Sequence, residues 1–64
     1  MDDDTQDLIV QLCTRIGMIM EDASVIALTY PRCTGDTRQA AIAKIGLAAK
    51  QISALVAAAE AMAA

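Results

Sequence analysis

The sequence contains no histidine, phenylalanine or tryptophan, and Tyr30 is its single aromatic residue. Acid–base catalysis near neutral pH usually relies on a histidine or on a pair of perturbed carboxylates, and a cysteine nucleophile needs a neighbouring base. The chain also lacks a glycine-rich phosphate-binding motif. We therefore expect a protein that is not an enzyme, with no catalytic residue, no metal site and no cofactor.

Cysteine is scarce as well, and the two thiols, Cys13 and Cys33, fit neither a C-x-x-C motif nor a zinc-binding pattern. A helix between them would hold them roughly 20 Å or more apart, which is beyond the reach of a disulfide. We expect two reduced thiols in a cytoplasmic protein.

Long uninterrupted apolar runs are also missing. Polar side chains interrupt the most apolar segment, residues 40–64, and these are Lys44, Lys50, Gln51 and Glu60. The first seven residues are acidic, whereas a signal peptide begins with positive charge. We expect neither a signal peptide nor a membrane span, and a cationic helix lying on a membrane surface is an alternative.

What the sequence does contain is helical periodicity. Apolar residues recur at alternating spacings of three and four in both halves, as in a heptad repeat. The predicted stripe of the first half is Ile9, Leu12, Ile16, Ile19, Ala23 and Ile26, with Cys13, Met20 and Ala27 beside it. The predicted stripe of the second half is Ile42, Ile45, Ala49, Ile52, Val56 and Ala59, flanked by Ala41, Ala48, Leu55 and Met62.

These stripes predict an all-α fold, in which residues 1–64 form one antiparallel helical hairpin. We expect helices near residues 4–29 and 36–62 and a loop near 30–35, because Pro31 stops the first helix and Gly35 permits a turn. Asp3 with Gln6, and Asp36 with Gln39, resemble capping boxes in which the aspartate is the N-cap. Each apolar face is wide enough for more than one neighbour, so we expect a homo-oligomeric bundle.

Acidic and basic residues are concentrated in different parts of the chain, and the basic part includes the predicted loop. Residues 1–22 carry six acidic residues against Arg15, whereas residues 31–50 carry four basic residues against Asp36. Arginines beside a helix N-terminus suit phosphate, hydroxyls add donors, and an aromatic ring offers a stacking surface for a base. The predicted ligand-binding residues are Tyr30, Arg32, Thr34, Asp36, Thr37 and Arg38.

A purely structural role for this segment is an open alternative. Tyr30 continues the apolar stripe four residues after Ile26, so it can close the end of a bundle. The basic loop can also pair with the acidic N-terminus of a second chain. Binding to duplex nucleic acid is disfavoured because the net charge is −3.

The segment that begins at Gly35 resembles the phage anti-CBASS sponge family, whose small helical proteins sequester cyclic oligonucleotide immune signals. The positions that carry the resemblance are Asp36, Arg38, Ala41, Ile42, Ala43, Leu47, Ala54, Leu55, Ala57 and Ala59. The family begins with a short extra segment that bears a tyrosine and a basic residue, and this chain lacks it. The resemblance implies a homo-oligomer with ligand pockets between subunits, acting in the host cytoplasm.

Three functions are therefore expected in order of preference. The first is a sponge for cyclic oligonucleotides or related nucleotides. The second is a homo-oligomeric adaptor or inhibitor that docks a protein through an exposed Ala/Met helix face. The third is a small dimeric bundle of the RNA-binding regulator type, which the negative charge disfavours.

Overall fold

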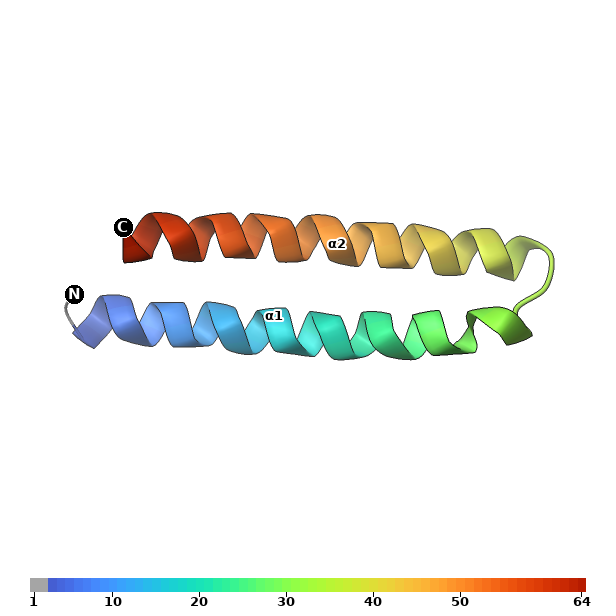
Figure 1. Ribbon diagram of the computed structural model, residues 1–64, viewed down its shortest axis with the longest axis horizontal. Coiled ribbons are helices and arrows are strands. Elements are labelled where there is room, and N and C mark those ends of the chain that lie inside the picture. The colour runs from blue at the N-terminus through green and yellow to red at the C-terminus, as the bar shows by residue number, and fades with distance from the viewer. Residues whose placement is uncertain (1–2) are drawn as a thin grey trace.

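The computed structural model describes residues 3–64, which form two antiparallel helices joined at one end (Figure 1). Helix α1 spans Asp3–Thr29, the short 3-10 helix η1 spans Tyr30–Arg32, and helix α2 spans Asp36–Ala63. The predicted all-α hairpin is confirmed, and residues 3–64 contain no strand. The acidic start of the chain also includes Asp2, which lies outside the described residues.

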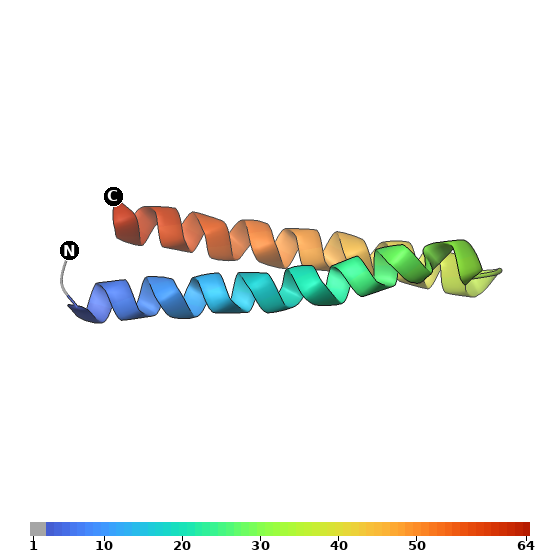
Figure 2. The ribbon, with the colours of Figure 1, turned by 60° about the horizontal axis from the view of Figure 1, so that its bottom comes forward.

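The hairpin is a long rod whose extents are 50 × 15 × 11 Å. Its helices lie side by side along their length, and Figure 2 shows that their axes are inclined to each other. The start of α1 and the end of α2 lie at one end of the rod, and η1 lies at the other (Figure 1). The loop segment with its arginines is therefore about as far as possible from the acidic start of the same chain.

The predicted stripe of α1 is the face that packs on α2. All six of its residues are partly buried, whereas the residues around them are exposed. Tyr30 in η1 is also partly buried and continues the same spacing. The long β-branched side chains of Ile9, Ile16 and Ile19 therefore supply much of the apolar area that α1 buries.

The predicted stripe of α2 is wrong in part. Its partly or fully buried residues are Ala41, Ile45, Ala48, Ile52, Leu55, Val56, Ala59 and Met62. The residues expected to flank the stripe thus belong to the seam together with four stripe residues, while Ile42 is 56% exposed and Ala49 is exposed. An alanine-rich helix is apolar on several sides, so its own periodicity fits two overlapping stripes. Small side chains at 41 and 48 let α2 approach the isoleucines of α1, and that packing selects between them.

The hairpin encloses almost no core. Among the described residues only Ala41 is buried, with 6% of its surface exposed. Two helices can cover one face of each other but cannot surround a side chain, so the seam residues stay partly open to solvent. Apolar residues left exposed include Leu8, Val10, Met18, Met20, Val25, Leu28, Ile42 and Leu47.

The turn into α2 differs from the predicted capping box. Gly35, and not Asp36, is the N-cap of α2, and it adopts φ 56° and ψ −130°. Asp36 is already the first helical residue, so its carboxylate cannot occupy the N-cap position together with Gln39. At the start of α1, Asp3 likewise lies inside the helix.

Candidate functional site

The loop end of the hairpin carries the predicted ligand-binding residues. We define the basic loop as residues 30–38, which run from η1 to the first turn of α2. Pro31 has no backbone N–H to continue the hydrogen bonds of α1, and the chain tightens there into η1; Gly35 supplies the backbone geometry that turns the chain into α2. All six predicted site residues lie in this segment because the two helices begin and end there.

The hydroxyl of Thr37 already has partners within the loop. The Oγ1 of Thr37 accepts a 2.9 Å hydrogen bond from the backbone N–H of Thr34 and donates one to the carbonyl of the same residue. The N–H of Thr37 donates to the Thr34 carbonyl at 3.2 Å, and the N–H of Arg38 donates to the Gly35 carbonyl at 3.1 Å. The N–H groups of Thr37 and Arg38 at the start of α2 are therefore not available to an anion.

Arg38 is held against the loop by one specific bond. Its Nε donates a 2.8 Å hydrogen bond to the carbonyl oxygen of Cys33, and the side chain is otherwise exposed. This bond uses Nε alone, so the Nη groups remain as donors for a ligand. Fixing a guanidinium in advance lowers the entropy cost of binding.

Arg32 and Asp36 are both exposed and lie on either side of the turn. Arg32 is the last residue of η1, and Asp36 is the first of α2. The predicted site thus combines two cationic side chains with one carboxylate at the end of the rod.

Tyr30 lies beside an open hollow on one side of the hairpin. The hollow has a volume of about 380 Å³ and is lined by Ala27, Tyr30, Ile42 and Ile45. This volume falls within the roughly 300–1,000 Å³ that is typical of small-molecule sites. The walls other than Tyr30 are aliphatic, so the hollow suits a flat apolar group such as the face of a base.

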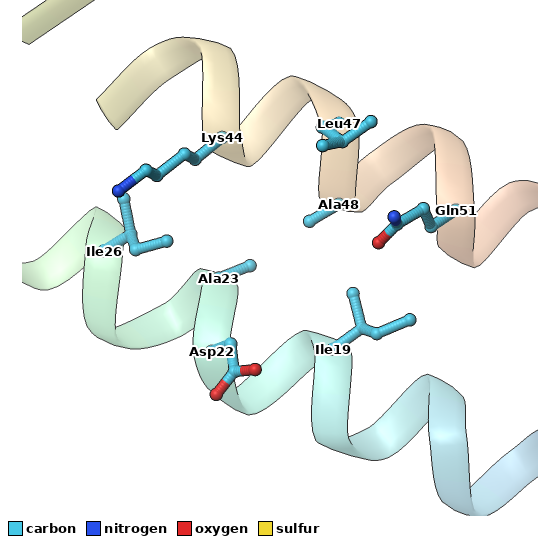
Figure 3. A pocket seen from close by; sticks show the side chains of 8 residues that line it. All are labelled: Ile19, Asp22, Ala23, Ile26, Lys44, Leu47, Ala48 and Gln51. Carbon is cyan, nitrogen blue, oxygen red and sulfur yellow. The ribbon is translucent and has the colours of Figure 1, made fainter. Parts of the chain in front are cut away.

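A second groove runs along the opposite side of the hairpin and was not predicted as a site. Its volume is about 180 Å³, and it is lined by Ile19, Asp22, Ala23, Ile26, Lys44, Leu47, Ala48 and Gln51. Figure 3 shows Ile19, Ala23 and Ala48 pointing into the space between the helices. The groove is smaller than a typical small-molecule site. Together with Arg15, its polar residues make this side of the hairpin the charged one.

Sequence reasoning missed the walls of the Tyr30 hollow. Ala27, Ile42 and Ile45 were assigned to helix packing, and nothing in their spacing singles out a cavity. One signal was available: Tyr30 continues the stripe of α1, so residues of α2 near the turn had to lie beside it. In the structure, Tyr30 lines the hollow together with these three residues.

The described part of the chain contains no group of three or more His, Cys, Asp or Glu residues that could hold a metal ion. Cys13 and Cys33 are free thiols. By length and composition, α2 is apolar enough to cross a membrane. An alanine-rich bundle helix has the same composition, so this property does not distinguish a span from an uncovered helix.

No protein-family model matches the chain, and neither the curated proteins nor the solved structures give a significant match.

Proposed function

We propose that this chain is a non-enzymatic, homo-oligomeric binding protein that sequesters a cyclic oligonucleotide or a related nucleotide. The observation that carries the proposal is the hollow beside Tyr30 at the end of the rod that also holds Arg32 and Arg38. A ligand of this class needs an apolar surface for a base and cationic donors for phosphate. Tyr30, which lines the hollow, and the two arginines all lie within the nine residues of the basic loop.

The resemblance of the segment from Gly35 to the anti-CBASS sponge family agrees with this proposal. Asp36 and Arg38, which are its most specific part, lie in the first turn of α2. Tyr30 and Arg32 come from the preceding segment and are assigned by their chemistry alone. The proposed ligand is bound and held, and none of the loop residues is given a role in bond cleavage.

Isothermal titration calorimetry tests this function directly. The chain is titrated with cyclic dinucleotides and cyclic trinucleotides, and with linear dinucleotides and inorganic phosphate as controls. A sponge binds at least one cyclic ligand with micromolar affinity or better and binds phosphate weakly. If no cyclic nucleotide releases or absorbs heat at high micromolar protein, the sponge function is wrong.

A second candidate is an adaptor or inhibitor that docks a protein partner. It is favoured by exposed apolar side chains outside the seam, among them Met18 at 62%, Val25 at 61% and Leu47 at 57%. Such residues on an accessible helix suit recognition of a complementary helix or groove. The adaptor function does not need Arg32 or Arg38, so the calorimetry separates the two candidates.

A further inference from the structure

One side of the hairpin has no charge along most of its length. On α1 this side follows a second heptad stripe, shifted around the helix from the seam, which consists of Val10, Cys13, Gly17, Met20, Ser24 and Ala27. All of these residues are exposed in the hairpin, and Met20 and Val10 are about half exposed. Residues at alternating spacings of three and four share one helix face, so the stripe is continuous.

α2 carries an equivalent stripe on the same side of the rod. It consists of Ile42, Gly46, Ala49 and Ser53, all of them exposed. Ala27 and Ile42 line one hollow together, which places the two stripes next to each other. Asp22, Lys44 and Gln51 line the groove on the opposite side. We call the two stripes together the uncharged face.

The glycines of this face have no structural reason within a single hairpin. A Cβ atom built at Gly17 or at Gly46 would meet nothing within 4 Å. Each glycine nevertheless costs about 1 kcal/mol relative to alanine in a helix interior. Ser24 and Ser53 lie seven residues beyond them and are also small. Small residues at this spacing allow another helix backbone to approach closely.

The surface area that the hairpin exposes can be compared with that of a compact monomer of the same mass. The chain exposes 4868 Å², whereas a compact monomer of 6.7 kDa exposes about 3,900 Å². The excess of roughly 1,000 Å² is close to the approximately 800 Å² that each partner buries in a standard protein interface. A single further hairpin is therefore sufficient to cover the excess.

We infer that the uncharged face is the surface through which two copies of this chain pair, forming a four-helix bundle. A second copy is the occupant that fits, because it offers the same uncharged, small-residue face and the same excess area. Pairing of identical faces is self-complementary under a two-fold axis. The inference rests on the self-association in the proposed function. Ala27 and Ile42 of this face also line the Tyr30 hollow, so the hollow lies at the loop end of the pairing surface. Pairing can be measured without a nucleotide.

Two matched substitutions test which face pairs. Ala49→Glu puts a carboxylate on the uncharged face, and Ala54→Glu puts the same group on the side with Arg15 and Gln51. Both residues are exposed in the same part of α2, so the change in helix propensity is equal. A buried charge without a partner is strongly unfavourable. By light scattering and sedimentation, Ala49→Glu is expected to raise the dissociation constant at least about a hundredfold, and Ala54→Glu to change it less than about threefold.

A thiol-labelling experiment tests the same face without Ala49→Glu, so it still applies if that substitution unfolds the helices. Cys13 lies on the uncharged face, and its neighbour Thr14 lies outside it. In the assembled protein, the Cys33→Ser variant should react with a maleimide at least about tenfold more slowly than the triple variant Cys13→Ser, Thr14→Cys, Cys33→Ser. Circular dichroism confirms that both retain their helices.

Three results would overturn the inference. Equal labelling of positions 13 and 14 in an assembled protein would show that the uncharged face is open. Dissociation by Ala54→Glu but not by Ala49→Glu would place the interface on the charged side, leaving self-association intact. A monomeric wild type that floats with vesicles of neutral phospholipid would show that this face binds lipid. Nucleotide binding by calorimetry is measured separately, so its failure is distinguishable from each of these.

Discussion

The Nε of Arg38 donates a 2.8 Å hydrogen bond to the carbonyl oxygen of Cys33, five residues earlier in the chain. This bond ties the first turn of α2 to the end of η1 across the turn formed by Thr34 and Gly35. Arg38 therefore holds the loop in shape and, in the proposed function, also presents its Nη groups to a phosphate. These two roles lead to different expectations for Arg38 and Arg32.

Replacing Arg38 with alanine should lower the free energy of unfolding by about 1 kcal/mol, because an exposed hydrogen bond to the Cys33 carbonyl is lost. Urea unfolding followed by circular dichroism, at one fixed protein concentration, measures this change. Arg32→Ala is the control and should leave stability within about 0.5 kcal/mol, since Arg32 is an exposed residue of η1. Equal stability of wild type and Arg38→Ala would contradict the structural role.

Arg32→Ala should weaken nucleotide binding by roughly tenfold to a hundredfold, because a hydrogen bond to a charged group contributes about 1.5–3 kcal/mol. Calorimetry with the best cyclic ligand measures this loss. Lys50→Ala removes the same charge from an exposed position on α2 outside the basic loop and should change affinity only slightly. If the two variants bound the ligand with identical affinities, binding would depend on the net charge of the protein and not on the position of Arg32.

The side chain of Thr37 should be needed for the turn into α2. Thr37→Val keeps the shape but removes the oxygen that accepts from the Thr34 N–H, which should cost about 1 kcal/mol. Thr37→Ser keeps the hydroxyl and should restore most of that loss. The midpoint of urea unfolding distinguishes them, and a valine variant as stable as the serine variant would count against the role of the hydroxyl.

Gly35 should tolerate no L-amino acid without a loss of stability, because its φ of 56° combined with a ψ of −130° is strained for L-residues. Gly35→Ala is expected to cost about 1–3 kcal/mol. Chemical synthesis of the 64-residue chain allows a decisive control with D-alanine, which favours the mirror-image conformation. D-alanine should be at least as stable as glycine; a D-alanine chain as unstable as the L-alanine one would reject this backbone geometry.

Cys13 and Cys33 should remain separate thiols within one chain. Cys13 lies midway along α1 and Cys33 follows η1 at the far end of the rod, so the helix keeps them roughly 30 Å apart. Mass spectrometry of the native protein under non-reducing conditions, followed by proteolysis, should find no peptide that joins the two within a monomer. An intrachain bridge would require α1 to unfold and would contradict the hairpin.

The sequence was sufficient for the order of the two α-helices and for where they meet the loop, whereas η1 at Tyr30–Arg32 was expected only as part of that loop. Pro31 and Gly35 act through local backbone geometry, so α1 ends at Thr29 and α2 begins at Asp36 as expected. The stripe of α1 was also predictable, because Ile9, Leu12 and Ile16 stand out among polar neighbours. Its residues could be assigned to the seam before any partner helix was known.

The details of the candidate site were less predictable. The capping box at Asp36 was wrong because the Thr34–Thr37 pair and the φ of Gly35 satisfy the turn in another way. Both arrangements use residues that favour helix starts, and the sequence does not rank them. The hydrogen bond from Arg38 to Cys33 was likewise not predictable, because it depends on the distance between the first turn of α2 and the end of η1.

Local signals in the sequence thus determined that this protein is a helical hairpin with a basic loop, since proline, glycine and heptad spacing act over a few residues. Only the tertiary structure decided which face of α2 meets α1, because alanine makes several of its faces equally apolar. Contact with the isoleucines of α1 selected Ala41 and Ala48 for the seam and left Ile42 and Ala49 outside it. This orientation of α2 about its own axis placed Ile42 and Ile45 beside Tyr30, where they line the hollow. It also left the charged and uncharged residues on opposite sides of the rod.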